Sequence, residues 1–107
     1  MNTILQTETF RTWFKALRDI KAKVAIGRRI ERAEEGNFGD HKALGGGLLE
    51  MRLQLGPGYR VYYACRGGVV YILLCGGDKS SQTKDIEAAQ RLWREIQEED
   101  HAHSDQI

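Results

Sequence analysis

The sequence predicts an α+β fold in which two N-terminal helices pack on an antiparallel sheet of about four strands and a further helix follows the sheet. Three observations predict it: two apolar stripes with helical period before residue 36, alternating apolar runs between glycine-rich turns, and a third helical stripe near the C-terminal end. A length of 107 residues suits one domain, which we place at residues 1–97. Residues 98–107 are expected to form an acidic, frayed tail.

The two N-terminal helices follow from apolar residues that recur with the period of a helix. The first stripe comprises Phe10, Trp13, Phe14 and Leu17, and the second comprises Ala22, Ile26, Ile30 and Ala33. Thr7 or Thr9 can cap the first helix, and Gly36 with Asn37 ends the second. Because each stripe needs a cover, we expect both helices to lie on the sheet.

The sheet is predicted from residues 48–79, where three apolar runs are separated by glycine-containing turns. Residues 3–7 alternate weakly and predict a short edge strand, whereas residues 38–47 are expected to form a loop. The final helix is predicted to begin near Thr83, and its apolar stripe is Ile86, Ala89, Trp93 and Ile96.

The turns also predict the register of the strands. A three-residue turn at residues 56–58 pairs Arg52 with Tyr62, and a two-residue turn at Gly67 and Gly68 pairs Tyr63 with Ile72. One face of the sheet is then apolar: Leu49, Met51, Leu53, Val61, Tyr63, Ile72 and Leu74. The other face carries Glu50, Arg52, Gln54, Arg60, Tyr62, Arg66 and Tyr71.

Charge is distributed unevenly along the chain. Residues 1–94 hold all 16 Lys and Arg residues against 10 of the 15 Asp and Glu residues, which leaves this part at +6 and the end acidic. A basic body suits a polyanionic partner, although a solvated helix surface also explains the charge between Arg11 and Arg32. For the tail we favour solubilising disorder over mimicry of RNA. No apolar run reaches the roughly 20 residues that cross a bilayer, so we expect a cytoplasmic protein without membrane contact.

Several classes of site lack the residues they need. The predicted register places Cys65 and Cys75 on opposite faces, so both are expected to be free thiols. Of the histidines His41, His101 and His103, two lie in the predicted tail, so we expect neither a metal site nor a cofactor. The glycine-rich strings lack the spacing of a phosphate-binding P-loop, and no Ser/His/Asp arrangement is present.

A cationic and aromatic sheet face is the remaining candidate site. It comprises Arg52, Arg60, Arg66, Tyr62 and Tyr71, joined by Lys79 from the exit of the last strand and Lys42 from the preceding loop. Guanidinium groups bind phosphates and tyrosines stack on bases, which favours single-stranded RNA as a ligand. A face paired within itself, such as Glu50 with Arg52, or covered by a partner protein, explains the same residues.

Four strings carry a family resemblance: GNFGD at residues 36–40, GLLEMR at 47–52, GPGYRVYY at 56–63 and LLCGGDKSSQ at 73–82. Together with the following Asp85-Ile86 and Ala88-Ala89, they closely resemble the HigB-like branch of the RelE/ParE toxin superfamily, whose members are often labelled addiction-module killer proteins. The similarity extends from Thr7 to about Ile96, which is nearly the whole chain.

This resemblance implies a RelE-like toxin with two N-terminal helices on a curved antiparallel sheet. It also implies a cognate helix-turn-helix antitoxin that covers the active face and that links the toxin to operator DNA. RelE-like members are typically metal-independent endoribonucleases that cut mRNA in the ribosomal A site, whereas ParE-like members inhibit DNA gyrase without performing chemistry. A degenerate member that retains only antitoxin binding is a third possibility.

The resemblance also implies roles for residues. Metal-free RNA cleavage by attack of the 2′-hydroxyl on the adjacent phosphate needs a base, cations for the phosphorane and a proton for the leaving oxygen. Arg60 matches the family's phosphate-binding arginine, Lys79 is a candidate acid, and Arg52 and Lys42 match positions that are often basic or catalytic. The predicted RNA-binding residues are Arg66, Tyr62, Tyr71, Gln54 and Glu50. Because the sheet has no histidine, the base stays open between Glu50, Lys42, another deprotonated lysine and no dedicated base.

Overall fold

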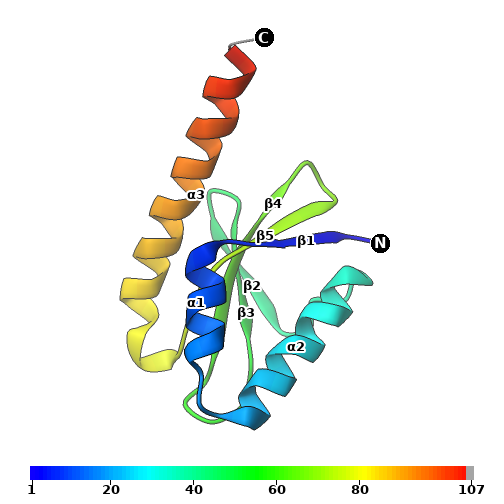
Figure 1. Ribbon diagram of the computed structural model, residues 1–107, viewed down its shortest axis with the longest axis vertical. Helices are drawn as coiled ribbons and strands as arrows, with labels where there is room; N and C mark the ends of the chain where they lie inside the picture. The colour runs from blue at the N-terminus through cyan, green and yellow to red at the C-terminus, as the bar shows by residue number, and fades with distance from the viewer. Residues whose placement is uncertain (106–107) are drawn as a thin grey trace.

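The computed structural model describes the backbone of residues 1–105 and the side chains of residues 1–100. In chain order the elements are β1 (Thr3–Gln6), α1 (Glu8–Ala16), α2 (Ile20–Glu34), β2 (His41–Gly45), β3 (Leu48–Arg52), β4 (Arg60–Arg66), β5 (Val70–Gly77), the 3-10 turn η1 (Lys79–Ser81) and α3 (Gln82–Asp105) (Figure 1). The predicted α+β class, with two helices before the sheet and one after it, is confirmed.

The sheet has five strands in the order β1-β5-β4-β3-β2 and is mixed, because β1 runs parallel to β5 while the other pairs are antiparallel. The predicted edge strand is therefore present, but the expectation of a wholly antiparallel sheet was wrong. The predicted loop at residues 38–47 contains β2. In this edge strand only Leu44 is partly buried. The strand therefore lacks the alternation of apolar and polar residues that marks a half-buried strand, and the sequence pattern did not predict it.

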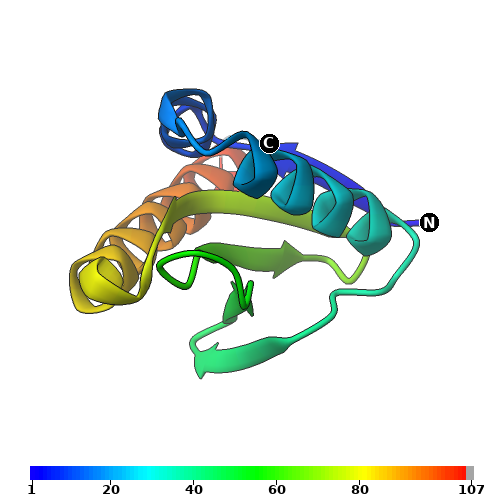
Figure 2. The same ribbon diagram turned by 90° about the horizontal axis from the view of Figure 1, so that it is seen from below.

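Helices cover both faces of the sheet. Helices α1 and α2 lie together on one side of the curved sheet (Figure 2), where Phe10, Ile26 and Ala33 pack against Val61 and Leu73. Helix α3 covers part of the opposite face, as Ala89 and Trp93 join a second core cluster of Leu48, Tyr62, Ala64, Ile72, Leu74 and Cys75. The sequence predicted an open polar surface on this second face. We call these two sides the α1/α2 face and the α3 face.

Strands β3 and β4 pair two residues away from the predicted register. Arg52 lies opposite Arg60, whereas the sequence paired it with Tyr62. The reason is that residues 53–59 connect the two strands, whereas the sequence predicted a turn of only three residues. Because side chains alternate with a period of two, this even shift keeps Arg52 and Arg60 on one face.

The register of β4 and β5 differs in a way that changes faces. Arg66 pairs with Val70, so the connecting turn has three residues and not two, and an irregularity follows between Tyr62 and Tyr63. An odd shift moves a strand's side chains to the other side of the sheet. The predicted face assignments of Ile72, Leu74 and Tyr71 were therefore wrong. Ile72 and Leu74 pack under α3, and Tyr71 packs on the α1/α2 side.

Local hydrogen bonds fix the helices to the sheet. Thr7 caps α1 by accepting a bond from the Phe10 amide at 3.0 Å, and its hydroxyl donates to the Leu74 carbonyl of β5 at 2.6 Å. The indole Nε1 of Trp93 donates to the Gly46 carbonyl at 2.9 Å, which joins α3 to the turn between β2 and β3. These bonds attach α1 and α3 to the sheet.

The C-terminal helix is longer than the sequence pattern indicated. Regular periodicity stops near Glu98, whereas α3 continues to Asp105. Residues 106 and 107, the end of the predicted tail, lie outside the described residues, as do the side chains of His101 and His103. Both cysteines are free thiols, as predicted. Within residues 1–105, no helix has the length and apolar composition that would let it cross a membrane.

Two buried tyrosines predict how stability depends on pH. Burial raises the pKa of Tyr63 from its ordinary 10.0 to about 12 and also raises the pKa of Tyr62. The unfolded chain therefore releases these protons at lower pH than the folded chain. Below about pH 10 both tyrosines are protonated in the folded and the unfolded chain, so they do not change the free energy of unfolding. Above about pH 10 the free energy of unfolding should fall, by up to about 1.4 kcal/mol per pH unit for each tyrosine.

Urea unfolding followed by tryptophan fluorescence from neutral pH to about pH 11 measures this loss. The single variants Tyr62→Phe and Tyr63→Phe should each make the alkaline decline shallower, because each removes one group whose ionisation favours the unfolded chain. At neutral pH Tyr62→Phe should not lower the stability, because the buried Tyr62 hydroxyl has no hydrogen-bond partner among the described residues. A decline as steep in both variants as in the original chain would contradict this explanation.

Candidate functional site

A hollow lined by cationic and loop residues lies where β3 leaves the sheet and β4 enters it. Its volume is about 480 Å³, and its lining consists of Leu53, Gln54, Leu55, Gly56, Pro57, Gly58, Arg60 and Lys79. We call it the Arg60 hollow. Three of the predicted site residues meet here: Arg60, Lys79 and Gln54.

Arg60 is half-buried at the start of β4, and the preceding turn holds its side chain. Its Nη1 donates to the carbonyl oxygens of Gly58 and Tyr59, both at 3.1 Å. Its Nε is buried and has no hydrogen-bond partner among the described residues. One edge of the guanidinium is thus fixed by the backbone, which orients the group without neutralising its charge.

Gly58 brings the two cations of the hollow together. Its φ of +80° is a conformation that residues with a Cβ adopt only with strain. A Cβ built there would lie 3.3 Å from Lys79 Cβ and 3.5 Å from Arg60 Nη1, so both side chains flank this glycine. The GPGYR string therefore supplies the close approach of Arg60 and Lys79.

Lys79 begins the short turn that joins β5 to α3. The Asp78 carboxylate caps this turn by accepting a bond from the Ser80 amide at 2.8 Å. The hydrogen bond from the Ser80 hydroxyl, and next the bond from the Ser80 amide, hold the pKa of Asp78 below its usual value. The Lys79 amide donates to the Pro57 carbonyl at 3.4 Å, and its side chain is exposed. The GGDKSSQ string thus ends the sheet beside the Arg60 hollow and leaves the Lys79 ammonium free to meet a ligand.

Arg52 lies opposite Arg60 on the same face and adds a further cation next to the hollow. Its Nη2 donates to Asp40 Oδ1 at 2.9 Å, and this hydrogen bond lowers the pKa of the Asp40 carboxyl. Both side chains are more than a third exposed, at 35% for Arg52 and 41% for Asp40, so water and salt screen the pair. Asp40 offsets part of the charge of Arg52, and the region stays cationic.

Arg29 of α2, which sequence reasoning missed, braces this corner of the fold. Its Nη1 donates to the Arg52 carbonyl at 2.8 Å, while its Nη2 donates to the Phe38 carbonyl at 2.9 Å and to the Asp40 carbonyl at 3.0 Å. Burial lowers its pKa. The available signal was its spacing, since a charged residue three positions after Ile26 falls on the apolar side of the helix.

Tyr62 and Glu50 do not lie on an open surface, which corrects the sequence-based prediction. Tyr62 is 0% exposed and Glu50 is 1% exposed, because α3 covers this part of the α3 face. Gln82 at the start of α3 donates from Nε2 to Glu50 Oε2 at 2.8 Å. Burial, and next the neighbouring Glu50 carboxylate, raise the pKa of Tyr62. A base cannot stack on Tyr62 in this arrangement, and Glu50 is a buried residue that links β3 to Gln82 of α3.

The remaining predicted residues lie apart from the Arg60 hollow. Tyr71 packs on Phe38, with ring centroids 4.7 Å apart, on the α1/α2 side. Arg66 lies at the other end of β4, about 20 Å along the strand from Arg60, and pairs with Asp100 of α3 at 3.2 Å. Lys42 is exposed on β2 opposite Glu50, so it points to the α3 face.

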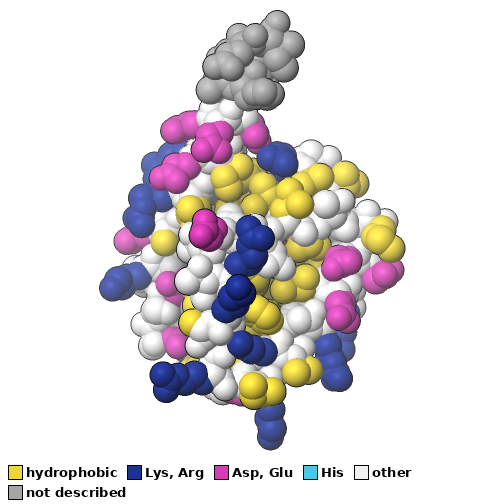
Figure 3. Space-filling model, viewed as in Figure 1, with side chains coloured by type: hydrophobic (Ala, Val, Ile, Leu, Met, Phe, Trp, Pro, Cys, Tyr) yellow, Lys and Arg dark blue, Asp and Glu magenta, His cyan; other side chains and the backbone are white. Residues whose placement is uncertain are grey.

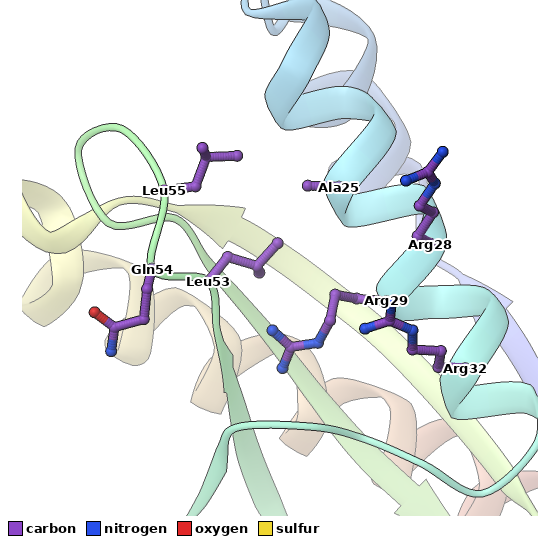
Figure 4. A pocket seen from close by; sticks show the side chains of 7 residues that line it. All are labelled: Ala25, Arg28, Arg29, Arg32, Leu53, Gln54 and Leu55. Atoms are coloured by element: carbon purple, nitrogen blue, oxygen red, sulfur yellow. The ribbon is translucent and has the colours of Figure 1, made fainter.

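A second hollow, of about 340 Å³, lies between α2 and the same β3–β4 connection (Figure 4). Its lining is Ala25, Arg28, Arg29, Arg32, Leu53, Gln54 and Leu55, and we call it the Arg28 hollow. Basic side chains also gather over α1 on the face shown in Figure 3. Within the described residues, no group of three or more His, Cys, Asp or Glu side chains could hold a metal ion.

Comparison with known proteins gives two similarities. A family model described as Phage derived protein Gp49-like (DUF891) matches residues 12–94, a span that includes both hollows. An uncharacterized protein of Haemophilus influenzae strain Rd is 48% identical over 93 residues, which cover 87% of this chain and 94% of the relative.

Proposed function

Because this chain belongs to the Gp49-like family of phage-derived proteins, which is a toxin–antitoxin type of family generally linked to endoribonuclease activity, we propose that it is a toxin that cleaves mRNA on the ribosome. Within that family we assign it to the HigB-like branch of the RelE/ParE superfamily. The observation that carries the proposal is the meeting of Arg60 and Lys79 around Gly58 in one open hollow, with Arg52 beside them.

The reaction that suits this hollow is transfer of a phosphodiester within the RNA. The 2′-oxygen of a ribose bonds to the adjacent phosphorus, the bond from phosphorus to the 5′-oxygen breaks, and the products end in a 2′,3′-cyclic phosphate and a 5′-hydroxyl. The 2′-hydroxyl loses a proton, and the leaving 5′-oxygen gains one.

Each cation has a part in this proposal. The guanidinium of Arg60, already fixed along one edge by the Gly58 and Tyr59 carbonyls, binds the phosphate oxygens and stabilises their added charge in the phosphorane. The exposed Lys79 ammonium donates the proton to the leaving oxygen. Arg52 and Lys42 add positive charge along the path of the strand, and Gln54 contacts the RNA at the edge of the hollow.

The burial of Glu50 bears on the choice of base. A carboxylate that is 1% exposed and bonded to Gln82 does not reach a ribose bound in the Arg60 hollow. We therefore propose that positioning and charge stabilisation carry the reaction, with water accepting the 2′-hydroxyl proton. Positioned cations alone contribute several orders of magnitude in rate when the reacting atoms are held in line.

The proposed partners follow from the same assignment. Messenger RNA on the cytoplasmic ribosome is the substrate, and a cognate helix-turn-helix antitoxin is the inhibitor that brings the toxin to operator DNA. No cofactor is part of the proposal.

Induction in bacteria tests the proposed function. The original chain should arrest growth and produce new RNA 5′ ends inside reading frames, and the double variant Arg60→Ala/Lys79→Ala should do neither. A matched control is Arg11→Ala/Lys15→Ala, which removes two exposed charges of α1 that line neither hollow. The control should stay toxic.

One result would overturn the proposed reaction, and another would overturn only the assignment of the site. Growth arrest with intact mRNA and inhibited gyrase would replace RNA cleavage by a gyrase-directed function. Undiminished mRNA cleavage in the Arg60→Ala/Lys79→Ala variant would remove the site assignment while leaving the toxin class in place. Thermal unfolding of each purified variant shows whether it is folded.

A further inference from the structure

The Arg28 hollow concentrates positive charge on one side of α2. Arg28 and Arg32 are four residues apart, so they are neighbours on the helix surface, and Arg29 lies beside them. Burial is the main cause of the lowered pKa of Arg29, and the neighbouring positive charge of Arg32 lowers it further. Figure 4 shows Arg29 and Arg32 reaching toward the side of α2 that faces Leu53, whereas Arg28 lies nearer the helix start and points away from Leu53.

The two exposed guanidinium groups of this hollow form no ion pair within residues 1–100. Among residues 1–100, the two ion pairs are Arg52 with Asp40 and Arg66 with Asp100, so neither Arg28 nor Arg32 belongs to one. Arg29 is committed to three backbone carbonyls and keeps its charge. Like charges at this helical spacing repel each other, and an anion bound between them relieves that repulsion.

The Arg28 hollow adjoins the Arg60 hollow. Leu53, Gln54 and Leu55 line both, so the two hollows lie on either side of the same three-residue segment. Gln54 is exposed on this shared rim, and its side chain points away from α2 in Figure 4. A chain of regularly spaced anions that fills one hollow can therefore cross Gln54 into the other.

We propose that the Arg28 hollow binds the phosphodiester backbone of the RNA strand next to the segment that is cleaved. Arg28 and Arg32 bind the phosphates, while Arg29 holds the loop that separates the two hollows. This inference rests on the proposed function, because it extends the path of the same RNA. In this proposal the basic surface of α2 is a second RNA subsite. The protein then binds RNA strands that are long enough to fill both hollows more tightly than shorter strands.

Binding of labelled oligoribonucleotides with 2′-O-methyl riboses, which cannot be cleaved by 2′-hydroxyl attack, tests the subsite. A short oligonucleotide fills the Arg60 hollow alone, whereas a long one also reaches the Arg28 hollow. The variant Arg28→Gln/Arg32→Gln should bind the long RNA about tenfold more weakly and bind the short RNA as before. Loss of two phosphate contacts should also reduce the slope of log K against log salt concentration by about 1.4 for the long RNA.

Two comparison variants sharpen the result. Arg11→Gln/Lys15→Gln changes the net charge equally on α1 and should leave the difference between long and short RNA intact. Arg28→Lys/Arg32→Lys keeps both charges and should retain most of the affinity for long RNA. Because Arg28 and Arg32 are exposed, their replacement should not unfold the protein.

The outcomes separate this inference from the proposed function. If the Arg28→Gln/Arg32→Gln variant binds long RNA as tightly as the original chain, or loses no more than the α1 control, the subsite is refuted and the cleavage proposal stands. An equal loss for short and long RNA also refutes the subsite, because the effect is then a general one of charge. Failure of the original chain to bind either RNA at low ionic strength would also refute the subsite, whereas the cleavage proposal, which places the mRNA on the ribosome, is decided by the induction experiment.

Discussion

Replacing Arg60 with lysine is expected to lower the rate of mRNA cleavage in a single turnover by about 10²- to 10³-fold, the usual effect of removing one group that stabilises the transition state. The guanidinium of Arg60 binds the Gly58 and Tyr59 carbonyls through Nη1, its Nε is buried, and its Nη2 is left for a phosphate. A lysine ammonium is a compact charge without this fixed fork, so it cannot hold the turn and the phosphate together. Cleavage of ribosome-bound mRNA by purified protein measures the effect.

A conservative change elsewhere on the same strand is the control for Arg60→Lys. Arg66 lies at the far end of β4 and pairs with Asp100, so Arg66→Lys should leave the cleavage rate unchanged. Urea unfolding should give nearly equal midpoints for both variants, which would separate a chemical effect from lost stability. An unchanged rate for Arg60→Lys would show that a charge alone suffices at this position and would refute the oriented role of the guanidinium.

Replacing Gly76 with alanine is expected to destabilise the fold by about 3 kcal/mol, the upper part of the usual range for overpacking. Gly76 lies on β5 opposite Val61, and α1 packs directly on it. A Cβ at this position would lie 2.3 Å from a ring carbon of Trp13. Because the indole is rigid and packed against Phe10 and Tyr59, it cannot move aside without disturbing the core. Calorimetry should show a lower melting temperature, by about 15 °C for a domain of this size.

A second glycine supplies the matched control for Gly76→Ala. No heavy atom lies within 4 Å of a Cβ built at Gly27, which is in the interior of α2. Gly27→Ala should therefore stabilise the protein by about 0.5 to 1 kcal/mol. Adding Trp13→Leu to the Gly76→Ala variant should recover part of the lost stability, since the smaller side chain leaves room for the methyl group. Unaltered stability in Gly76→Ala would show that α1 does not rest on β5 in this way.

The helices and the two principal cations could be predicted from the sequence because the signals for them are local. The stripes that begin at Phe10 and Ala22 follow from helical period, which does not depend on the rest of the fold. Arg60 and Lys79 each stand next to a glycine-rich string, and the structure places both in one hollow. Their catalytic roles stay a prediction.

The burial of Tyr62 and Glu50 could not be predicted in the same way. The face on which a strand residue lies depends on the length of each turn and on any bulge, and one residue of error moves Tyr71 to the opposite side. Whether a face is open depends in addition on where α3 packs. Its apolar stripe was visible in the sequence, but the surface that it covers was not.

The sequence by itself determined that this chain forms an α+β domain with two helices before its sheet and one after it, and that cations stand beside its glycine turns. Only the tertiary structure decided which polar residues stay exposed and that Arg28 and Arg32 of α2 line a hollow next to that of Arg60. The physical reason is range: helical period and turn chemistry act over a few residues, whereas burial and the meeting of charges depend on segments that are far apart in the chain.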